Sequence, residues 1–184
     1  SRRALRKVLS RVDSLLDIAK IESGNLFLAR EPVDLNILIE NVLTELQPLA
    51  TELEVKIEVE LAPDLPLLNA DGDKVERMLL NLLDNALKYT PIGGNVRVEL
   101  TRDKDTARLV VADSGPGIPA SDRARVLQRF TRLDQARSQP GNGLGLALVN
   151  AVTLQHHGRL TLGDNDPGLL VILELPALSP LPSP

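Results

Sequence analysis

The sequence contains no cysteine and no tryptophan, and no apolar run approaches the roughly 20 residues that a membrane-spanning helix needs. The lack of cysteine excludes disulfides, thiolate zinc sites and cysteine nucleophiles, and it fits a reducing compartment. The charged start, residues 1–6, is not followed by an apolar core, so no signal peptide is predicted. We therefore expect a cytoplasmic segment that makes no membrane contact.

The sequence also lacks an excess of positive charge. Lys and Arg together number 21 against 25 Asp and Glu, which gives a net charge of −4. Nucleic-acid binders rely on many cations that neutralise phosphates, so no nucleic-acid partner is expected. The length of 184 residues suits one domain with a short appendage. Aromatic residues are few as well, so aliphatic side chains must form most of the core, which 43% hydrophobic residues can supply.

The first 24 residues are predicted to form one helix that ends at Gly24. Its apolar residues follow the 4-3-4-3 spacing of a coiled-coil seam: Leu5, Leu9, Val12, Leu16 and Ala19. Two interpretations are open, because this seam can dock on the following domain or pair with a partner helix. The second interpretation predicts a homodimer through this helix.

Residues 25–176 are predicted to form the main domain, and residues 177–184 a disordered tail. Expected strands lie at 26–28, 55–61, 96–100, 107–112, 159–162 and 169–175, with a turn at 102–105. Expected helices lie at 34–49, from Asp71 or Asp73 to Tyr89, and at 144–156, with a short helical patch at 122–130. This order predicts an α/β (α+β) two-layer sandwich, in which helices cover one face of a mixed, mostly antiparallel sheet.

The helix ending at Tyr89 carries a polar stripe opposite its apolar stripe. Asn81, Asp84, Asn85 and Lys88 are spaced at i, i+3, i+4 and i+7. Amide oxygens are suitable ligands for Mg²⁺, and a lysine can neutralise a phosphate. An ordinary amphipathic surface helix would show the same spacing, so this segment alone does not decide.

Two glycine-rich segments follow. In Asp113-Ser-Gly115-Pro-Gly117-Ile118-Pro119, the aspartate could accept a hydrogen bond from an exocyclic amine, which favours adenine over guanine. In Gly141-Asn-Gly143-Leu144-Gly145-Leu146, the backbone could cradle phosphates at a helix N-terminus. The latter matches neither a Walker nor a Rossmann glycine pattern. A tight turn and a flexible connector are the simpler alternatives for the two segments.

Taken together, these segments resemble the sensor histidine kinases of two-component systems. Residues 81–91 are similar to the N box of that family, 113–119 to the G1 box, Arg129-Phe130-Thr-Arg132 to the F box and 141–149 to the G2 box. The resemblance implies the Bergerat ATP-binding fold, ATP and Mg²⁺ as cofactors, homodimers and a cognate response regulator as partner. It also implies that the chain is the cytoplasmic part of a larger sensor.

The resemblance further implies roles for individual residues. Asn85 would ligate Mg²⁺, with Asn81 beside it and Lys88 near the phosphates, while Asp113 would accept the adenine amine. The remaining implied nucleotide contacts are Tyr89, Gly115, Gly117, Ile118, Phe130, Arg132, Gly141, Gly143, Leu144, Gly145 and Leu146. Residues 115–143 have little core character and are expected to be a lid over the site or a disordered insertion. This region contains Arg123, Arg125, Arg129, Arg132 and Arg137. One of these cations could stabilise phosphate charge, and most are expected to be solvated.

The chain departs from the family at its histidines and at its last glycine motif. Its two histidines, His156 and His157, end a helix rather than occupying a phosphoacceptor context. The acceptor histidine is therefore expected on a dimerisation helix that is absent from this chain. The segment Asp166-Pro-Gly168-Leu-Leu lacks the small hydroxyl-bearing residues of the family pattern.

The leading hypothesis is the catalytic ATP-binding domain of such a kinase. A nucleotide-sensing pseudokinase and a dimerisation scaffold are the alternatives. An anti-sigma-type serine kinase would share the fold, but the long N-terminal helix and the F-box-like segment disfavour it.

Overall fold

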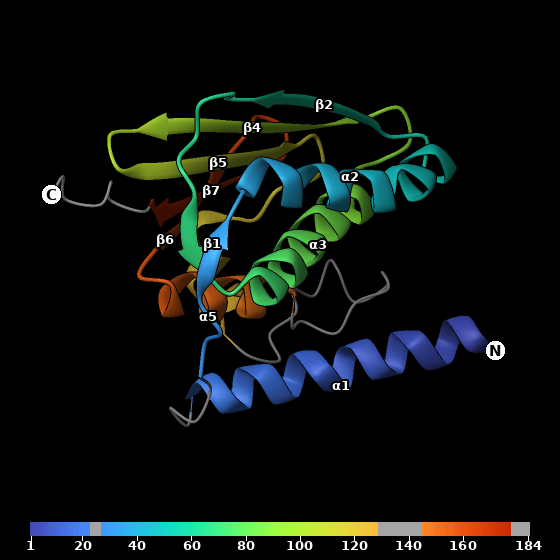
Figure 1. The fold of residues 1–184 in the computed structure, drawn as a ribbon. Coiled ribbons are helices and arrows are strands. Elements are labelled where there is room, and N and C mark those ends of the chain that lie inside the picture. Colours follow the sequence, from blue (N-terminus) through green and yellow to red (C-terminus); the bar gives the residue numbers. More distant parts are fainter. Residues whose placement is uncertain (23–26, 129–144, 178–184) are drawn as a thin grey trace, which may run out of the picture.

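The computed structural model describes residues 1–22, 27–128 and 145–177 (Figure 1). The helices are α1 (Arg2–Glu22), α2 (Leu35–Glu52), α3 (Gly72–Tyr89), α4 (Arg123–Val126) and α5 (Gly145–Gln155), with a 3-10 turn at Ala120–Asp122. The strands are β1 (Glu31–Val33), β2 (Lys56–Leu61), β3 (Leu68–Ala70), β4 (Asn95–Asp103), β5 (Thr106–Asp113), β6 (Arg159–Asp164) and β7 (Leu169–Pro176). Among these described elements, no helix is both long and apolar enough to cross a membrane.

The main sheet has the order β2-β4-β5-β7-β6. Only the β2–β4 pair is parallel, and the other three pairs are antiparallel. Helices α2, α3 and α5 lie on one face of this sheet, as Figure 1 shows. The predicted two-layer sandwich with a mixed, mostly antiparallel sheet is therefore confirmed.

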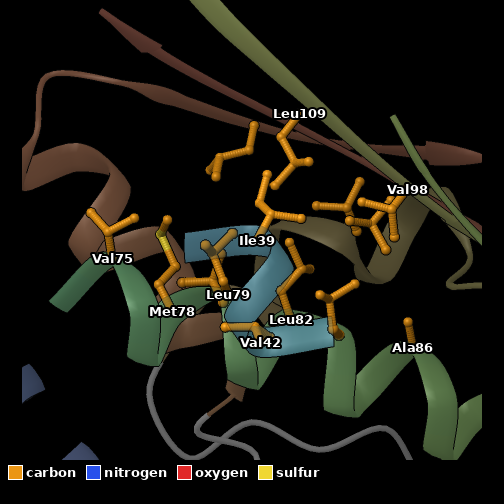
Figure 2. Close-up of a cluster of buried hydrophobic side chains, with 14 of the residues drawn as sticks. Ile39, Val42, Val75, Met78, Leu79, Leu82, Ala86, Val98 and Leu109 are labelled. Carbon is orange, nitrogen blue, oxygen red and sulfur yellow. The ribbon is translucent and has the colours of Figure 1, made fainter. Parts of the chain in front are cut away.

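The core lies between the sheet and the helical layer. From α3, the side chains of Val75, Met78 and Leu82 point into it, and Ile39 and Val42 of α2 join them (Figure 2). Each of these five side chains is at most 1% exposed. Because α3 contacts both α2 and α5, it is the central helix of the layer, and its orientation determines where its polar stripe lies.

Local signals position the two long helices. Asp34 is the N-cap of α2, as predicted, and its carboxylate accepts hydrogen bonds from the backbone N–H groups of Asn36 and Ile37. Asp71 rather than Asp73 is the N-cap of α3 and accepts from the N–H of Lys74. Thr90 and Pro91 follow the last residue of α3, as the sequence indicated.

Two strands and one turn differ from the sequence prediction. The strand expected at 26–28 is instead β1, because the antiparallel partner strand β3 pairs with Glu31–Val33, while Phe27 is 92% exposed. Strand β3 itself was not predicted. The turn expected at 102–105 is shorter, since β4 extends to Asp103 and β5 begins at Thr106, opposite it.

Helix α1 contacts α5 and lies on the side of the helical layer away from the sheet (Figure 1). Leu15 packs against the core. The seam residues Leu5, Leu9, Val12 and Leu16 are 60%, 54%, 46% and 49% exposed. Docking of the seam on the chain's own domain is therefore wrong for these four residues.

Candidate nucleotide-binding site

The polar stripe of α3 lies half-buried beside the start of α5. Asn81, Asn85, Lys88 and Tyr89 are all intermediate in exposure. The Nδ2 atom of Asn81 is buried and has no hydrogen-bond partner among the described residues. A buried amide donor without a partner is unusual in a folded protein, and it points to a polar group that the chain itself does not supply.

Asn85 lies directly against the first residue of α5. A Cβ built on Gly145 would be 2.5 Å from Nδ2 of Asn85, closer than two such atoms can approach. Glycine at position 145 therefore allows α5 to begin next to the Asn85 amide. The sequence predicted that these two segments share a site, and the structure brings them into contact.

The side chain of Lys88 forms an ion pair within α3. Its Nζ lies 2.7 Å from Oδ2 of Asp84, one turn earlier on α3, and both side chains are about one-quarter exposed, at 26% and 29%. The ammonium is thus held at the end of the polar stripe. It remains accessible to a second anion on its exposed side.

Asp113 closes β5 and is 5% exposed. Its Oδ1 accepts hydrogen bonds from the backbone N–H of Gly115, at 2.9 Å, and of Leu169, at 3.1 Å. Burial raises the pKa of the Asp113 carboxyl above its ordinary value of 3.8, while the N–H groups of Leu169 and Gly115 oppose this increase. The side chain is therefore an acceptor in fixed orientation rather than a solvated surface carboxylate.

Glycines let the turn after Asp113 lie close to its neighbours. A Cβ on Gly115 would be 2.5 Å from the carbonyl oxygen of Tyr89, which ends α3. Gly117 has a φ of +74°, and its Cβ would be 2.9 Å from the carbonyl oxygen of Gly168. Both contacts need a residue without a side chain, so the turn is built against α3 on one side and the β6–β7 turn on the other.

The remaining predicted contacts divide into two groups. Ile118 lies in the turn after Asp113, and Leu146, in the first turn of α5, packs against the hydrophobic core. Phe130, Arg132, Gly141, Gly143 and Leu144 lie outside the described residues. The predicted helical patch at 122–130 corresponds to the 3-10 turn and α4, as far as the structure describes it.

Sequence reasoning missed the contacts of the β6–β7 turn. The Nδ2 of Asn165 donates to the carbonyl oxygen of Asp113 at 2.8 Å. Arg123, expected among the solvated cations, bonds Asp164 at 2.5 Å and donates from Nε to the carbonyl oxygen of Ile118 at 3.2 Å. The only sequence feature that pointed to this turn was the departure of the Asp166-Pro-Gly168-Leu-Leu segment from the family pattern.

The far end of α3 has a second polar cluster. The backbone N–H of Asp71 donates to Nε2 of His156 at 3.1 Å, and Nδ1 of that ring is 2.8 Å from the carbonyl oxygen of Val152. His156 is 5% exposed, and burial lowers its pKa. Oδ2 of Asp71 also accepts from the N–H of Ala29, in the segment that follows α1.

Comparisons with known proteins agree with this geometry. The family model described as histidine kinase-, DNA gyrase B- and HSP90-like ATPase matches residues 70–179. The adaptive-response sensory kinase SasA of Synechococcus sp. (strain JA-2-3B'a(2-13)) is 34% identical over 161 residues, which are 87% of this chain and 43% of the relative. The signal transduction histidine-protein kinase/phosphatase MprB of Mycobacterium bovis (strain BCG / Pasteur 1173P2) is 39% identical over 158 residues, 85% of this chain and 30% of the relative. The chain thus spans less than half the length of these relatives.

Solved structures show the same likeness. A mycobacterial sensor histidine kinase MprB structure has a TM-score of 0.72 and 37% identity, over 80% of this chain and 97% of that one. Full-length ShkA, solved in complex with AMPPNP, has a TM-score of 0.82 and 30% identity, over 98% of this chain and 38% of that one.

Proposed function

The chain belongs to the ATPase family of histidine kinases, DNA gyrase B and HSP90, as a catalytic ATP-binding domain of the sensor histidine kinase type, and we propose that it binds Mg-ATP and donates the γ-phosphoryl group to a histidine on another segment. One observation carries the proposal. Three segments far apart in sequence meet at Asn85–Gly145 and at Tyr89–Gly115, and in each contact a glycine leaves space for the approach.

Asp113 is proposed to recognise the adenine base. Its Oδ1 is held by two backbone N–H groups, so Oδ2 is proposed to accept the exocyclic amine. A hydrogen bond to a charged acceptor contributes about 1.5–3 kcal/mol. Guanine has a carbonyl at that position, which would place acceptor against acceptor, so adenine is preferred. Gly115, Gly117 and Ile118 would line this end of the site.

The polar stripe of α3 is proposed to hold the phosphates and the metal. The amide oxygen of Asn85 suits Mg²⁺, a cation that prefers oxygen ligands and retains waters and phosphate oxygens. The unpartnered Nδ2 of Asn81 fits a phosphate or water oxygen, and Lys88 would share its charge between Asp84 and a phosphate. Bound Mg²⁺ would neutralise phosphate charge as the γ-phosphoryl group leaves.

The lid contacts are proposed from the resemblance to the family. Gly141, Gly143, Leu144, Gly145 and Leu146 would cover the phosphates, Phe130 and Arg132 would belong to the same lid, and Tyr89 would lie beside the nucleotide.

The phosphoryl acceptor is proposed to be a nitrogen of a histidine other than the two at the C-terminal end of α5. His156 is buried, and both of its ring nitrogens are hydrogen-bonded, so it cannot attack a phosphorus atom. In the proposed step the acceptor nitrogen bonds to the γ-phosphorus. The bond to the oxygen that bridges β and γ breaks, and ADP retains that electron pair.

Partners and domain limits are proposed on the same basis. The exposed seam of α1 would pair with a second copy, which makes the protein a homodimer. Residues 1–24 would be the end of the dimerisation helix and 25–176 the catalytic domain. The predicted tail begins one residue too early, because Ala177 packs against the core and its N–H donates to the carbonyl oxygen of Asp105 at 2.7 Å. The rest of that tail, 178–184, lies outside the described residues. A cognate response regulator would receive the phosphoryl group, and the chain would act in the cytoplasm.

Calorimetric titration with Mg-ATP tests the proposal. Asp113→Asn and Asn85→Ala should each weaken binding by at least about tenfold, which corresponds to about 1.4 kcal/mol. Asn41→Ala, an exposed amide on α2, is the matched control and should bind like the wild type. Wild type without measurable affinity for Mg-ATP would refute the proposal.

A transfer assay then separates kinase from nucleotide sensor. The chain is mixed with a longer form of the same protein that carries the preceding helix and Asn85→Ala. Radiolabel from γ-labelled ATP should appear on a histidine of the longer form. ATP binding without transfer would instead support the pseudokinase alternative.

A further inference from the structure

The β6–β7 turn, residues 164–168, contacts the adenine-recognition turn, residues 113–118, at several points. It closes on itself through a hydrogen bond from the N–H of Asn165 to the carbonyl oxygen of Gly168, at 3.0 Å. The following N–H, that of Leu169, is the donor to Oδ1 of Asp113. The turn is therefore a compact unit whose position fixes the carboxylate.

Asn165 holds the backbone of the same aspartate. Its amide donates to the Asp113 carbonyl oxygen at 2.8 Å across 52 residues of sequence. Gly168 makes this approach possible, because a Cβ at that position would lie 1.8 Å from the same oxygen. Asp113 is thus fixed at its side chain by Leu169 and at its main chain by Asn165.

Arg123 holds the other end of the recognition turn. Its guanidinium donates to the carbonyl oxygen of Ile118 and bonds Asp164, the last residue of β6. The arginine side chain is 22% exposed, whereas Asp164 is 62% exposed. The contact therefore bridges the two turns at the surface, and its geometry rather than its Coulomb energy is the relevant property.

We propose that Asn165 and Arg123 are positioning residues for adenine specificity, which act by holding the 113–118 turn on the β6–β7 turn. This inference rests on the proposed function, because it assigns a role relative to a bound adenine. Neither residue needs to touch the nucleotide. Removing Asn165 leaves the Asp113 side chain present and still bonded to the N–H groups of Gly115 and Leu169, but its main chain loses one of its contacts with the β6–β7 turn, so the carboxyl group is held less precisely against the base amine.

The ratio of ATP to inosine triphosphate affinity measures this role. The two nucleotides differ at the Watson–Crick edge of the purine, where inosine has a carbonyl in place of the 6-amine and a hydrogen on N1. The wild type should prefer ATP by about 10- to 100-fold, as expected for one hydrogen bond to a charged acceptor. A general loss of fold or of phosphate binding would weaken both nucleotides equally.

Asn165→Ala should weaken ATP binding about three- to tenfold, the effect of one neutral hydrogen bond, and leave inosine triphosphate binding within about twofold. Asn41→Ala is the matched control. In an Asp113→Ala background, Asn165→Ala should have no further effect on ATP affinity, because its action passes through that carboxylate. Equal weakening of both nucleotides, or full effect in the Asp113→Ala background, would overturn the inference.

Arg123→Ala provides a second variant if Asn165→Ala does not fold. Arg125→Ala is its control, because Arg125 bonds Asp122 on the same short segment and does not reach β6. Only Arg123→Ala should lower the ratio of the two affinities, and equal ratios for both variants would overturn the role of Arg123. Wild type that binds neither nucleotide would defeat the proposed function itself, whereas wild type with normal preference and unchanged variants defeats only this inference.

Discussion

Replacing Gly168 with alanine should strongly destabilise the domain. The residue has a φ of +117°, and its new Cβ would lie 1.8 Å from the carbonyl oxygen and 2.6 Å from the carbonyl carbon of Asp113. Both are backbone atoms of β5, so no flexible side chain can move aside. The β6–β7 turn would have to separate from Asp113, which would break the bonds from Asn165 and Leu169.

The size of the effect follows from two contributions. A backbone conformation that side chains rarely adopt costs about 1–3 kcal/mol. Forcing extra atoms into a filled space costs about another 1–3 kcal/mol. The free energy of unfolding should therefore fall by about 2–6 kcal/mol, out of the roughly 5–15 kcal/mol typical of a domain. A weakened affinity for Mg-ATP should accompany it, since Asp113 moves.

Urea denaturation followed by circular dichroism measures this loss of stability, provided that the slope of the free energy of unfolding against urea concentration is the same for both proteins. Gly163→Ala, on β6 of the same hairpin, is the matched control, because its Cβ would lie 3.6 Å from Leu170, an ordinary contact. That substitution should stabilise by about 0.5–1 kcal/mol, since alanine is less flexible than glycine in a strand. If Gly168→Ala lowered the free energy of unfolding by less than about 1 kcal/mol, the Asp113 carbonyl oxygen could not occupy the space that a side chain at position 168 needs, and the prediction would be refuted.

Three further substitutions test the described geometry. Burial lowers the pKa of His156, so the contribution of its neutral ring to stability is fully present above pH 6.5 and is lost as the pH falls below 6.5. His156→Gln should therefore reduce the pH dependence of the free energy of unfolding, measured by urea denaturation between pH 5 and 8. Burial raises the pKa of Asp113, so the wild type loses stability as the pH rises past 3.8, and Asp113→Asn should melt higher than wild type at pH 7 while binding ATP more weakly. His157 has a φ of 59°, so His157→Gly should raise the free energy of unfolding by up to about 1 kcal/mol in the same urea assay.

Local signals made most of the elements predictable from the sequence. Asp34 and Asp71 both cap helices whose apolar spacing is regular, and α3 has the same polar and apolar faces that its sequence indicates. Strand β3 was not predictable, because Leu68–Ala70 is too short to show a period. The turn between β4 and β5 was predicted too long, because Arg102 and Asp103 at the end of β4 are exposed and as polar as turn residues.

The candidate site divides in the same way. Asn85 and Asp113 stand in recognisable segments, so their meeting with neighbouring glycines could be anticipated. Asn165 and Arg123 could not, because their partners are 52 and 41 residues away and a polar contact at such separation leaves no local pattern. Arg123 was grouped with solvated cations for this reason.

The double use of α3 restricts where this chain can change in length. Its apolar side chains enter the core (Figure 2), while Asn85 lies against Gly145 at the start of α5. One inserted residue would rotate all later side chains by about 100°, which would turn an asparagine into the core and a leucine out of it. Insertions should instead accumulate at the β4–β5 hairpin end, where Asp103 and Lys104 are exposed and no site residue follows in the same helix. The spacing of polar and apolar residues along α3 is therefore more strongly constrained than its exact composition as the sequence diverges.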